Sequence, residues 1–207
     1  MEKELTGLIL AGGGSTRLGQ DKARLRLSGK SLLERTVHLA RRHCKRVYVS
    51  GRDPSGQGLD APWLADDWPG IGPMGGILTG LNRLGGPLLV LACDLPLIQV
   101  RTLRKLIKAR DQRPASAVMT AYQQAETGYI ETLVAVYEDQ SARFLDQERK
   151  KGVYKLSQAI PESARHLVPY TREQAEEFLN INSPADLALL GRVKGAPETE
   201  PSFLGES

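Results

Sequence analysis

A run of glycines near the start of the chain is followed by two cations. Gly12, Gly13 and Gly14 come directly after an apolar stretch, and Arg17 and Lys22 stand a few residues further on. Glycines let backbone amides converge on an anion without interference from a Cβ, and the two cations can hold a triphosphate. The segment therefore predicts a phosphate-binding loop, and the alternative is a flexible turn with surface charges.

Asp94 stands at the end of another apolar stretch, residues 87–92. Ligands of open parallel sheets collect beyond the carboxyl ends of the strands. A carboxylate at such an end suits Mg²⁺, which takes one or two carboxylates together with phosphate oxygens and waters. The alternative is that Asp94 caps the following turn. Cys93 has no histidine near it in the sequence, so we interpret it as a small core residue.

A third segment, residues 66–76, is rich in glycine and proline and precedes a helical pattern. A rigid loop of this kind can approach a base or a ribose closely. Asp66 or Asp67 would accept hydrogen bonds there from guanine nitrogens or ribose hydroxyls. The alternative is an acidic first turn of the helix, which the helix dipole favours.

Strand and helix patterns alternate over the first 120 residues and would position these three segments. The predicted strands are 7–11, 46–50, 87–92 and 115–121, and the predicted helices are 32–40, 74–84 and 100–110. The alternation indicates an α/β fold with a mostly parallel sheet. The stretch 87–92 is apolar on both faces, which is typical of a strand covered by helices on both sides.

The second half of the chain is less regular. We predict strands at 132–137, near 166–170 and a last one ending at Asn182, with helices near 141–148, 154–159 and 184–190. Ser183 would cap the last helix, with Pro184 at its first position. We expect a single domain over residues 1–191 and a flexible polar tail over 192–207.

The composition is that of a globular protein, since 41% of the 207 residues are hydrophobic and 25% are charged. These values exclude a wholly disordered chain, a collagen-like repeat and a disulfide scaffold. No apolar run approaches the roughly 18 residues of a membrane span, and no secretory signal is expected. With two cysteines, Cys44 and Cys93, we expect a cytoplasmic protein.

The formal net charge of +4 would suit either a nucleic acid or a polyanionic small molecule as ligand. Aromatic residues make up only 5% of the chain, which argues against a base-stacking platform and hence against nucleic acid. The three histidines lack zinc-site spacing, and no serine hydrolase motif is present. Gln20-Asp21 replaces the Lys-Ser/Thr pair of a Walker A loop.

Four blocks of this sequence, in order, resemble the signature of the molybdenum cofactor guanylyltransferases. They are Leu10-Ala11-Gly12-Gly13 with Ser15, Arg17, Gly19 and Asp21-Lys22; Gly72-Pro73-Met74-Gly75-Gly76; Cys93-Asp94-Leu95-Pro96; and residues 178–184. Together they span residues 7 to about 190. The resemblance implies a three-layer Rossmann-like nucleotidyltransferase fold that uses Mg²⁺ to convert GTP and molybdopterin into molybdopterin guanine dinucleotide and pyrophosphate.

The resemblance also implies roles for residues at matching positions. On the nucleotide side these positions are Leu10, Ala11, Gly12, Gly13, Lys22, Ser50, Asp66 and Asp94. Arg17 and Lys22 would bind phosphates and stabilise the leaving pyrophosphate, with Asp94 as the metal ligand. Asn180 and Asn182 would lie near the metal and the pterin phosphate.

The sequence departs from the family pattern at three places. Ser50 stands where a family member has a nucleotide-contacting asparagine, and Thr132, after Glu131, replaces a proline of the pterin-side segment. Asp66 and Asp67 compete for one family aspartate, and the spacing favours Asp66. Ala-Gly-Gly, rather than Ala-Ala-Gly, favours guanine over cytosine.

Three alternatives stay open at this point. The chain could act on another phosphorylated acceptor such as a sugar phosphate, use CTP, or be a non-catalytic nucleotide-binding regulator. Retention of Arg17, Lys22 and Asp94 argues against the regulator. A homo-oligomer and transient contacts with molybdenum cofactor insertion proteins are implied by the resemblance alone.

Overall fold

A computed structural model describes residues 4–12, 22–27, 29–181 and 186 of the chain. The strands are β1 (Thr6–Leu10), β2 (Arg26–Leu27), β3 (Lys30–Ser31), β4 (Arg46–Ser50), β5 (Trp63–Leu64), β6 (Leu88–Ala92), β7 (Met119–Gln124), β8 (Ile130–Tyr137) and β9 (Arg165–Tyr170). The α-helices are α1 (Leu32–Ala40), α2 (Pro73–Leu84), α3 (Val100–Asp111), α4 (Ser141–Lys150) and α5 (Leu156–Ala159). Short 3₁₀ helices are η1 (Lys22–Arg24), η2 (Ser55–Gln57), η3 (Glu162–Ala164) and η4 (Arg172–Phe178).

Seven strands form one sheet in the order β5-β4-β1-β6-β8-β7-β9. β1 pairs in parallel with β4 on one side and β6 on the other, and β8 is the strand that runs antiparallel to its neighbours. The chain thus leaves β1 first toward β4 and later toward β6. Such a reversal of strand order creates a ligand-binding crevice at the carboxyl ends of the strands. Gly12, the segment 66–76 and Asp94, which are the described parts of the three predicted site segments, lie at this edge.

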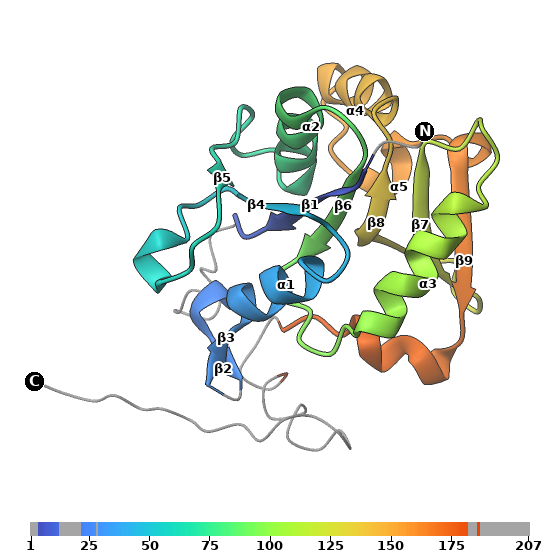
Figure 1. Cartoon of the computed structure of the whole chain (residues 1–207). Helices are drawn as coiled ribbons and strands as arrows, with labels where there is room; N and C mark the ends of the chain where they lie inside the picture. The colour runs from blue at the N-terminus through green and yellow to red at the C-terminus, as the bar shows by residue number, and fades with distance from the viewer. Residues whose placement is uncertain (1–3, 13–21, 28, 182–185, 187–207) are drawn as a thin grey trace, which may run out of the picture.

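Helices cover both faces of the sheet, as Figure 1 shows. On one face α1 and α3 contribute Leu33, Val37, Leu103 and Leu106 to a core that includes Ile9 and Leu91. On the other face α2, α4 and α5 pack against Leu8 and Val90. Every residue of β6 is buried, because both of its faces lie under helices. The mostly parallel three-layer α/β fold predicted from the sequence is confirmed.

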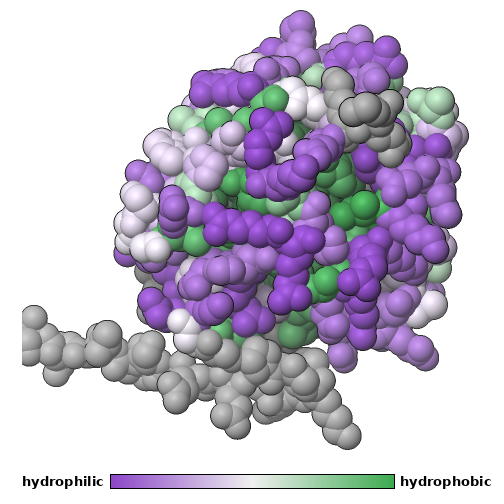
Figure 2. All heavy atoms as spheres, in the orientation of Figure 1, coloured by the Kyte–Doolittle hydropathy of each residue, from purple (hydrophilic) through white to green (hydrophobic). Residues whose placement is uncertain are grey.

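The face that carries α1 and α3 is mainly hydrophilic on its outside. Figure 2 shows polar side chains over both helices, interrupted by patches of hydrophobic surface beside α1. The N-terminus of α1 is capped by Ser31, whose Oγ accepts a hydrogen bond from the amide of Glu34 (3.1 Å). This cap fixes the start of the helix directly after the β2–β3 hairpin.

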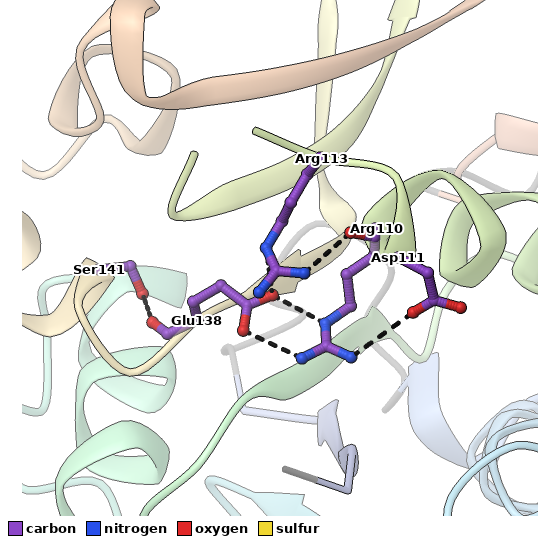
Figure 3. Close-up of polar contacts among 5 residues, drawn as sticks. All are labelled: Arg110, Asp111, Arg113, Glu138 and Ser141. Atoms are coloured by element: carbon purple, nitrogen blue, oxygen red, sulfur yellow. Dashed lines mark hydrogen bonds and ion pairs between the residues drawn. The ribbon is translucent and has the colours of Figure 1, made fainter. Parts of the chain in front are cut away.

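A buried ion pair ties α3 to the end of β8. Arg110 donates from Nε to Oε1 of Glu138 (2.7 Å) and from Nη2 to Oε2 (3.0 Å), and Arg113 Nε lies 3.2 Å from Oε1. Figure 3 also shows Ser141 Oγ donating to the Glu138 carbonyl, which continues the network into α4. The last residue of β8 pairs with the first of β6, so this network holds the sheet edge opposite the crevice.

Two predicted strands differ from the structure. β7 begins at Met119 rather than 115, because residues 114–117 form a turn in which the Ala117 amide donates to the Pro114 carbonyl (2.9 Å). The last strand, expected to end at Asn182, is also wrong in its described residues. A capping box between Thr171 and Gln174 starts η4, and residues 179–181, which follow η4, form no strand. Asn182 itself lies outside the described residues.

Most other element predictions are confirmed within a few residues. The sequence patterns missed the two-residue strands β2, β3 and β5, which are too short to show a hydrophobic period. The predicted helix 184–190 and the tail 192–207 lie outside the described residues, apart from Asp186. The single-domain boundary at 191 therefore stays a prediction.

Candidate active site

The carboxyl ends of β1 and β4 approach each other through two glycines. A Cβ added to Gly51 would lie 2.7 Å from the Cα of Gly12, and Gly51 has a φ of +88°. A side chain at Gly51 would thus be strained by its backbone conformation and by the contact. The close approach leaves the exposed Gly12 at the crevice, directly before the predicted phosphate loop.

Ala11 is held in this position by the neighbouring strand. Its amide donates to the carbonyl of Ser50 (3.1 Å), and its carbonyl accepts from Arg52 Nε (2.7 Å). The next strand is tied in as well, because the Cys93 amide donates to the Leu10 carbonyl (3.2 Å). The ends of β4, β1 and β6 therefore form one continuous hydrogen-bonded edge.

Helix α2 begins against this edge because its first turns carry glycines. A Cβ on Gly76 would lie 2.5 Å from Ser50 Oγ and 3.1 Å from Leu10 Cδ2. A side chain there would push α2 away from the strands. Ser50 is 3% exposed, so its hydroxyl lies beneath α2 rather than on the open surface.

Asp66 lies beside the first turn of α2. Its Oδ1 accepts hydrogen bonds from the amide of Trp68 (2.9 Å) and from Thr79 Oγ1 (3.3 Å). A Cβ on Gly75 would approach both carboxylate oxygens to 2.8 Å. Both hydrogen bonds use Oδ1, so within the described part of the chain Oδ2 keeps acceptor capacity for a ligand.

Asp67 has a different environment. Arg83 binds both of its carboxylate oxygens, with Nε 3.0 Å from Oδ2 and Nη2 donating to Oδ1. This bidentate pair neutralises the Asp67 carboxylate and fixes its orientation toward Arg83. The two aspartates that compete for one family position thus differ in their environments.

Asp94 and the segment after η4 meet at the end of β6. The amide of Ile181 donates to the carbonyl of Asp94 (3.0 Å), and Ile181 is 1% exposed. Asn180 and Asp94 are both half-buried. The segments that carry the predicted metal ligand and the predicted acceptor-side asparagine are therefore neighbours, although they are far apart in the sequence.

The donor set at Asp94 fits a magnesium ion held largely by substrate. In the described residues, no group of three or more His, Cys, Asp and Glu side chains converges as a closed metal cage would require. Mg²⁺ commonly uses one or two carboxylates and takes its other ligands from phosphates and water. A single carboxylate at the crevice is sufficient for that arrangement.

A half-buried carboxylate lies at the same edge on the β7–β9 side. Glu131, the second residue of β8, accepts a hydrogen bond from the Tyr170 hydroxyl (2.6 Å). Burial raises the pKa of Glu131, and the hydrogen bond from Tyr170 lowers it by a smaller amount. This pair lies in the segment that the sequence resemblance linked to the acceptor.

The structure does not describe the side chains of several predicted site residues. Gly13, Arg17 and Asn182 lie outside the described residues, and for Lys22 only the backbone position in η1 is described. Conversely, sequence reasoning missed Arg52 and Thr79. Arg52 follows a strand end, which was an available signal, whereas nothing in the helical pattern of α2 marked Thr79.

Comparisons with known proteins agree with this geometry. Residues 7–178 match the family model described as a MobA-like NTP transferase domain. The chain is 34% identical to a probable molybdenum cofactor guanylyltransferase of Chloroflexus aggregans over 92% of this chain and 95% of that protein. It is 31% identical to a molybdenum cofactor biosynthesis bifunctional protein of Synechocystis over 88% of this chain, but spans only 52% of that protein.

A solved structure has the same fold. The crystal structure of molybdopterin-guanine dinucleotide biosynthesis protein A from Archaeoglobus fulgidus superposes with a TM-score of 0.72 and 25% sequence identity. The match covers 89% of this chain and 96% of the other. None of the helices in the described part of the present chain has the length and apolar character needed to cross a membrane.

Proposed function

The chain belongs to the MobA-like NTP transferase family, and on this premise we propose that it transfers GMP from GTP to the phosphate of molybdopterin. The products are molybdopterin guanine dinucleotide and pyrophosphate. The relatives named molybdenum cofactor guanylyltransferase support this reaction. The observation that carries it is the hydrogen bond from Ile181 to Asp94, because it joins the acceptor-side segment to the predicted metal ligand at the edge formed by the ends of β4, β1 and β6.

The nucleotide lies across the ends of β1 and β4 in this proposal. Leu10, Ala11 and Gly12 line it, and Gly13 shapes the phosphate turn. Asp66 accepts hydrogen bonds from the guanine or the ribose. The environments of the two residues favour Asp66 over Asp67. Both hydrogen bonds described for Asp66 go to Oδ1, so Oδ2 can accept from the ligand, whereas Arg83 binds both carboxylate oxygens of Asp67.

The reaction needs positioning and charge neutralisation more than proton transfer. A terminal phosphate oxygen of the acceptor attacks the α-phosphorus of GTP, and the bond from that phosphorus to the pyrophosphate oxygen breaks. The attacking phosphate monoester is already anionic near neutral pH, so no general base is required. In-line alignment and stabilisation of the leaving group then provide the rate enhancement.

The chain's own cations and amides provide that stabilisation. Arg17 and Lys22 bind the phosphates and the leaving pyrophosphate in the proposed complex, and Asp94 holds the metal ion. Bound Mg²⁺ would neutralise charge on the reacting phosphates. Asn180 and Asn182 orient the acceptor phosphate. Ser50 is buried under α2 and acts indirectly. Its carbonyl accepts the hydrogen bond from the Ala11 amide and so holds the segment that lines the nucleotide.

We further propose that the protein works in the cytoplasm on GTP and molybdopterin, without nucleic acid or membrane. Cys44 and Cys93 are both buried free thiols, as expected of a protein in a reducing compartment. Assembly into a homo-oligomer and transient contacts with molybdenum cofactor insertion proteins stay predictions.

One incubation tests the proposed reaction. Purified protein is mixed with Mg²⁺, metal-loaded molybdopterin and either GTP or CTP, and the dinucleotide is sought by mass spectrometry. Product with GTP alone supports the proposal, and product with CTP alone would change the assigned base from guanine to cytosine. If neither nucleotide gives product, but pyrophosphate is released once a sugar phosphate is added, the acceptor is a sugar phosphate rather than molybdopterin. Nucleotide binding without any turnover would favour the non-catalytic regulator.

A further inference from the structure

A groove of about 280 Å³ lies between helix α1 and the loop from β6 to α3. One wall, the cationic wall, carries Lys30, Arg35 and Arg42, with His38 among them. The other wall is apolar and includes Leu95, Pro96 and Ile98. We call this feature the α1 groove. It is separate from the nucleotide crevice, although its apolar wall begins at the residue that follows Asp94.

The cationic wall has little compensating negative charge. None of the residues that line the groove is an Asp or a Glu. Glu34, beside it, is shared by Lys30 Nζ (4.0 Å) and His38 Nε2 (3.7 Å). Within the described part of the chain, Arg35 Nε is buried without a hydrogen-bond partner. Burial lowers the pKa of the Arg35 guanidinium, so an anion in the groove would be favoured beside it.

The spacing of these cations favours an extended ligand over a compact one. Between Lys30 and Arg42, the helical residues 32–40 alone advance by about 12 Å, at about 1.5 Å per helical residue. A single phosphate or pyrophosphate is too small to contact cations spread over that length. An extended polypeptide repeats on one face at about 6.8 Å, so its carboxylates can follow the cationic wall while alternate side chains face the other way.

The opposite wall indicates what the alternate side chains are. Leu95 and Pro96 are buried and Ile98 is half-buried, so apolar side chains of a ligand would complete the packing there. No Phe, Tyr or Trp lines the groove, which argues against stacked bases of a single-stranded nucleic acid. Figure 2 shows the same combination, with hydrophobic patches beside hydrophilic side chains over α1.

We propose that the α1 groove binds an extended, acidic segment of a partner protein in which carboxylate and apolar side chains alternate. The carboxylates pair with Lys30, Arg35 and Arg42, and the apolar side chains pack on Leu95 and Ile98. A partner bound there lies next to the Asp94 loop. This inference rests on the groove alone and does not depend on the proposed reaction.

The test uses two fluorescein-labelled synthetic octapeptides and the full chain, with binding followed by fluorescence anisotropy. One peptide alternates Glu and Leu, and the other alternates Glu and Ser, so that both carry the same charge. We expect the Glu–Leu peptide to bind about tenfold more tightly or better. The variant Lys30→Gln/Arg42→Gln should weaken its binding by about tenfold or more, because two exposed cations are lost.

A matched variant controls for net charge. Arg143→Gln/Lys155→Gln removes two exposed cations outside the groove, and it should change peptide binding by less than about twofold. Thermal unfolding checks that each variant is folded. Equal weakening by both double variants, or equal binding of both peptides, would overturn the proposal. Displacement of the peptide by stoichiometric pyrophosphate or by a single-stranded oligonucleotide would also overturn it, in favour of those ligands.

Discussion

The backbone amide of Ile181 donates a hydrogen bond to the carbonyl of Asp94 across 3.0 Å. This contact joins the end of the described chain to the end of its central strand β6. It brings the segment that carries Asn180 next to the segment that carries Asp94, the predicted metal ligand. Because the bond uses backbone atoms, side-chain variants at Asp94 leave it possible and test the chemistry of the carboxylate.

The first prediction concerns that carboxylate. Asp94→Asn should reduce Mg²⁺-dependent dinucleotide formation by about 100-fold or more, which corresponds to about 2.7 kcal/mol of activation free energy. The amide keeps the shape of the side chain but loses its negative charge. Steady-state kinetics measure the effect, and Asp60→Asn, at an exposed position, serves as the control. A variant that kept most of its turnover would remove Asp94 as the metal ligand.

Lys22 tests the predicted phosphate loop. Lys22→Ala should lower turnover by about tenfold or more, because each 1.4 kcal/mol of lost transition-state stabilisation costs about a factor of ten. Lys45→Ala is the control, since Lys45 is exposed and pairs with Glu4 at the protein surface. Kinetics unchanged from those of the unmodified protein would mean that the glycine loop does not hold the reacting phosphates.

Asp66 and Asp67 should differ in their effect on base preference. Asp66→Asn should lower the ratio of kcat/KM for GTP over ATP by about tenfold or more, because a hydrogen bond to a charged group contributes about 1.5–3 kcal/mol. Asp67→Asn breaks an exposed pair with Arg83, worth about 0–1 kcal/mol, and should leave the ratio nearly unchanged. The opposite order would assign the family aspartate to Asp67.

The sequence predicted the elements with a clear hydrophobic pattern but not those that are decided by helix capping. α1 and β6 were predictable because their apolar residues repeat with the period of a helix or fill a strand on both faces. Thr171 and Gln174, which form the capping box at the start of η4, have the residue types and the spacing of such a box in the sequence. The apolar residues after them nevertheless suggested a strand. Local patterns therefore favoured the wrong element where capping decided the structure.

The sequence predicted which residues belong to the candidate site, but not the contacts that these residues make. Strand ends followed by glycine or aspartate pointed to Gly12 and Asp94, because carboxyl ends of parallel strands share one edge. The contact of Ile181 with Asp94 and the difference between Asp66 and Asp67 depend on tertiary packing. No spacing in the sequence encodes the positions of Thr79 and Arg83 relative to those two aspartates.

Glycine variants should separate backbone strain from steric contact at the crevice. Gly51→Ala meets both a positive φ and the Cα of Gly12, so it should lower the free energy of unfolding by about 2 kcal/mol or more. Gly58 has a positive φ with open space around it, and Gly58→Ala should lose about 1 kcal/mol. Gly56→Ala, with neither feature, should change little. Urea denaturation measures all three, and equal losses at Gly51 and Gly58 would argue against the close approach.

Glu131 should give the protein a specific pH dependence. Burial raises the pKa of its carboxyl above the ordinary value of 4.5, so the folded state favours the protonated form. Its stabilising contribution is full below about pH 4.5 and is lost as the pH rises through the raised folded pKa. Glu131→Gln should therefore become more stable relative to the unmodified protein between pH 4.5 and neutrality, as urea denaturation at several pH values would measure. Tyr170→Phe removes the hydrogen bond that favours the carboxylate and should enlarge the loss. A stability difference between Glu131→Gln and the unmodified protein that does not change with pH would contradict this account.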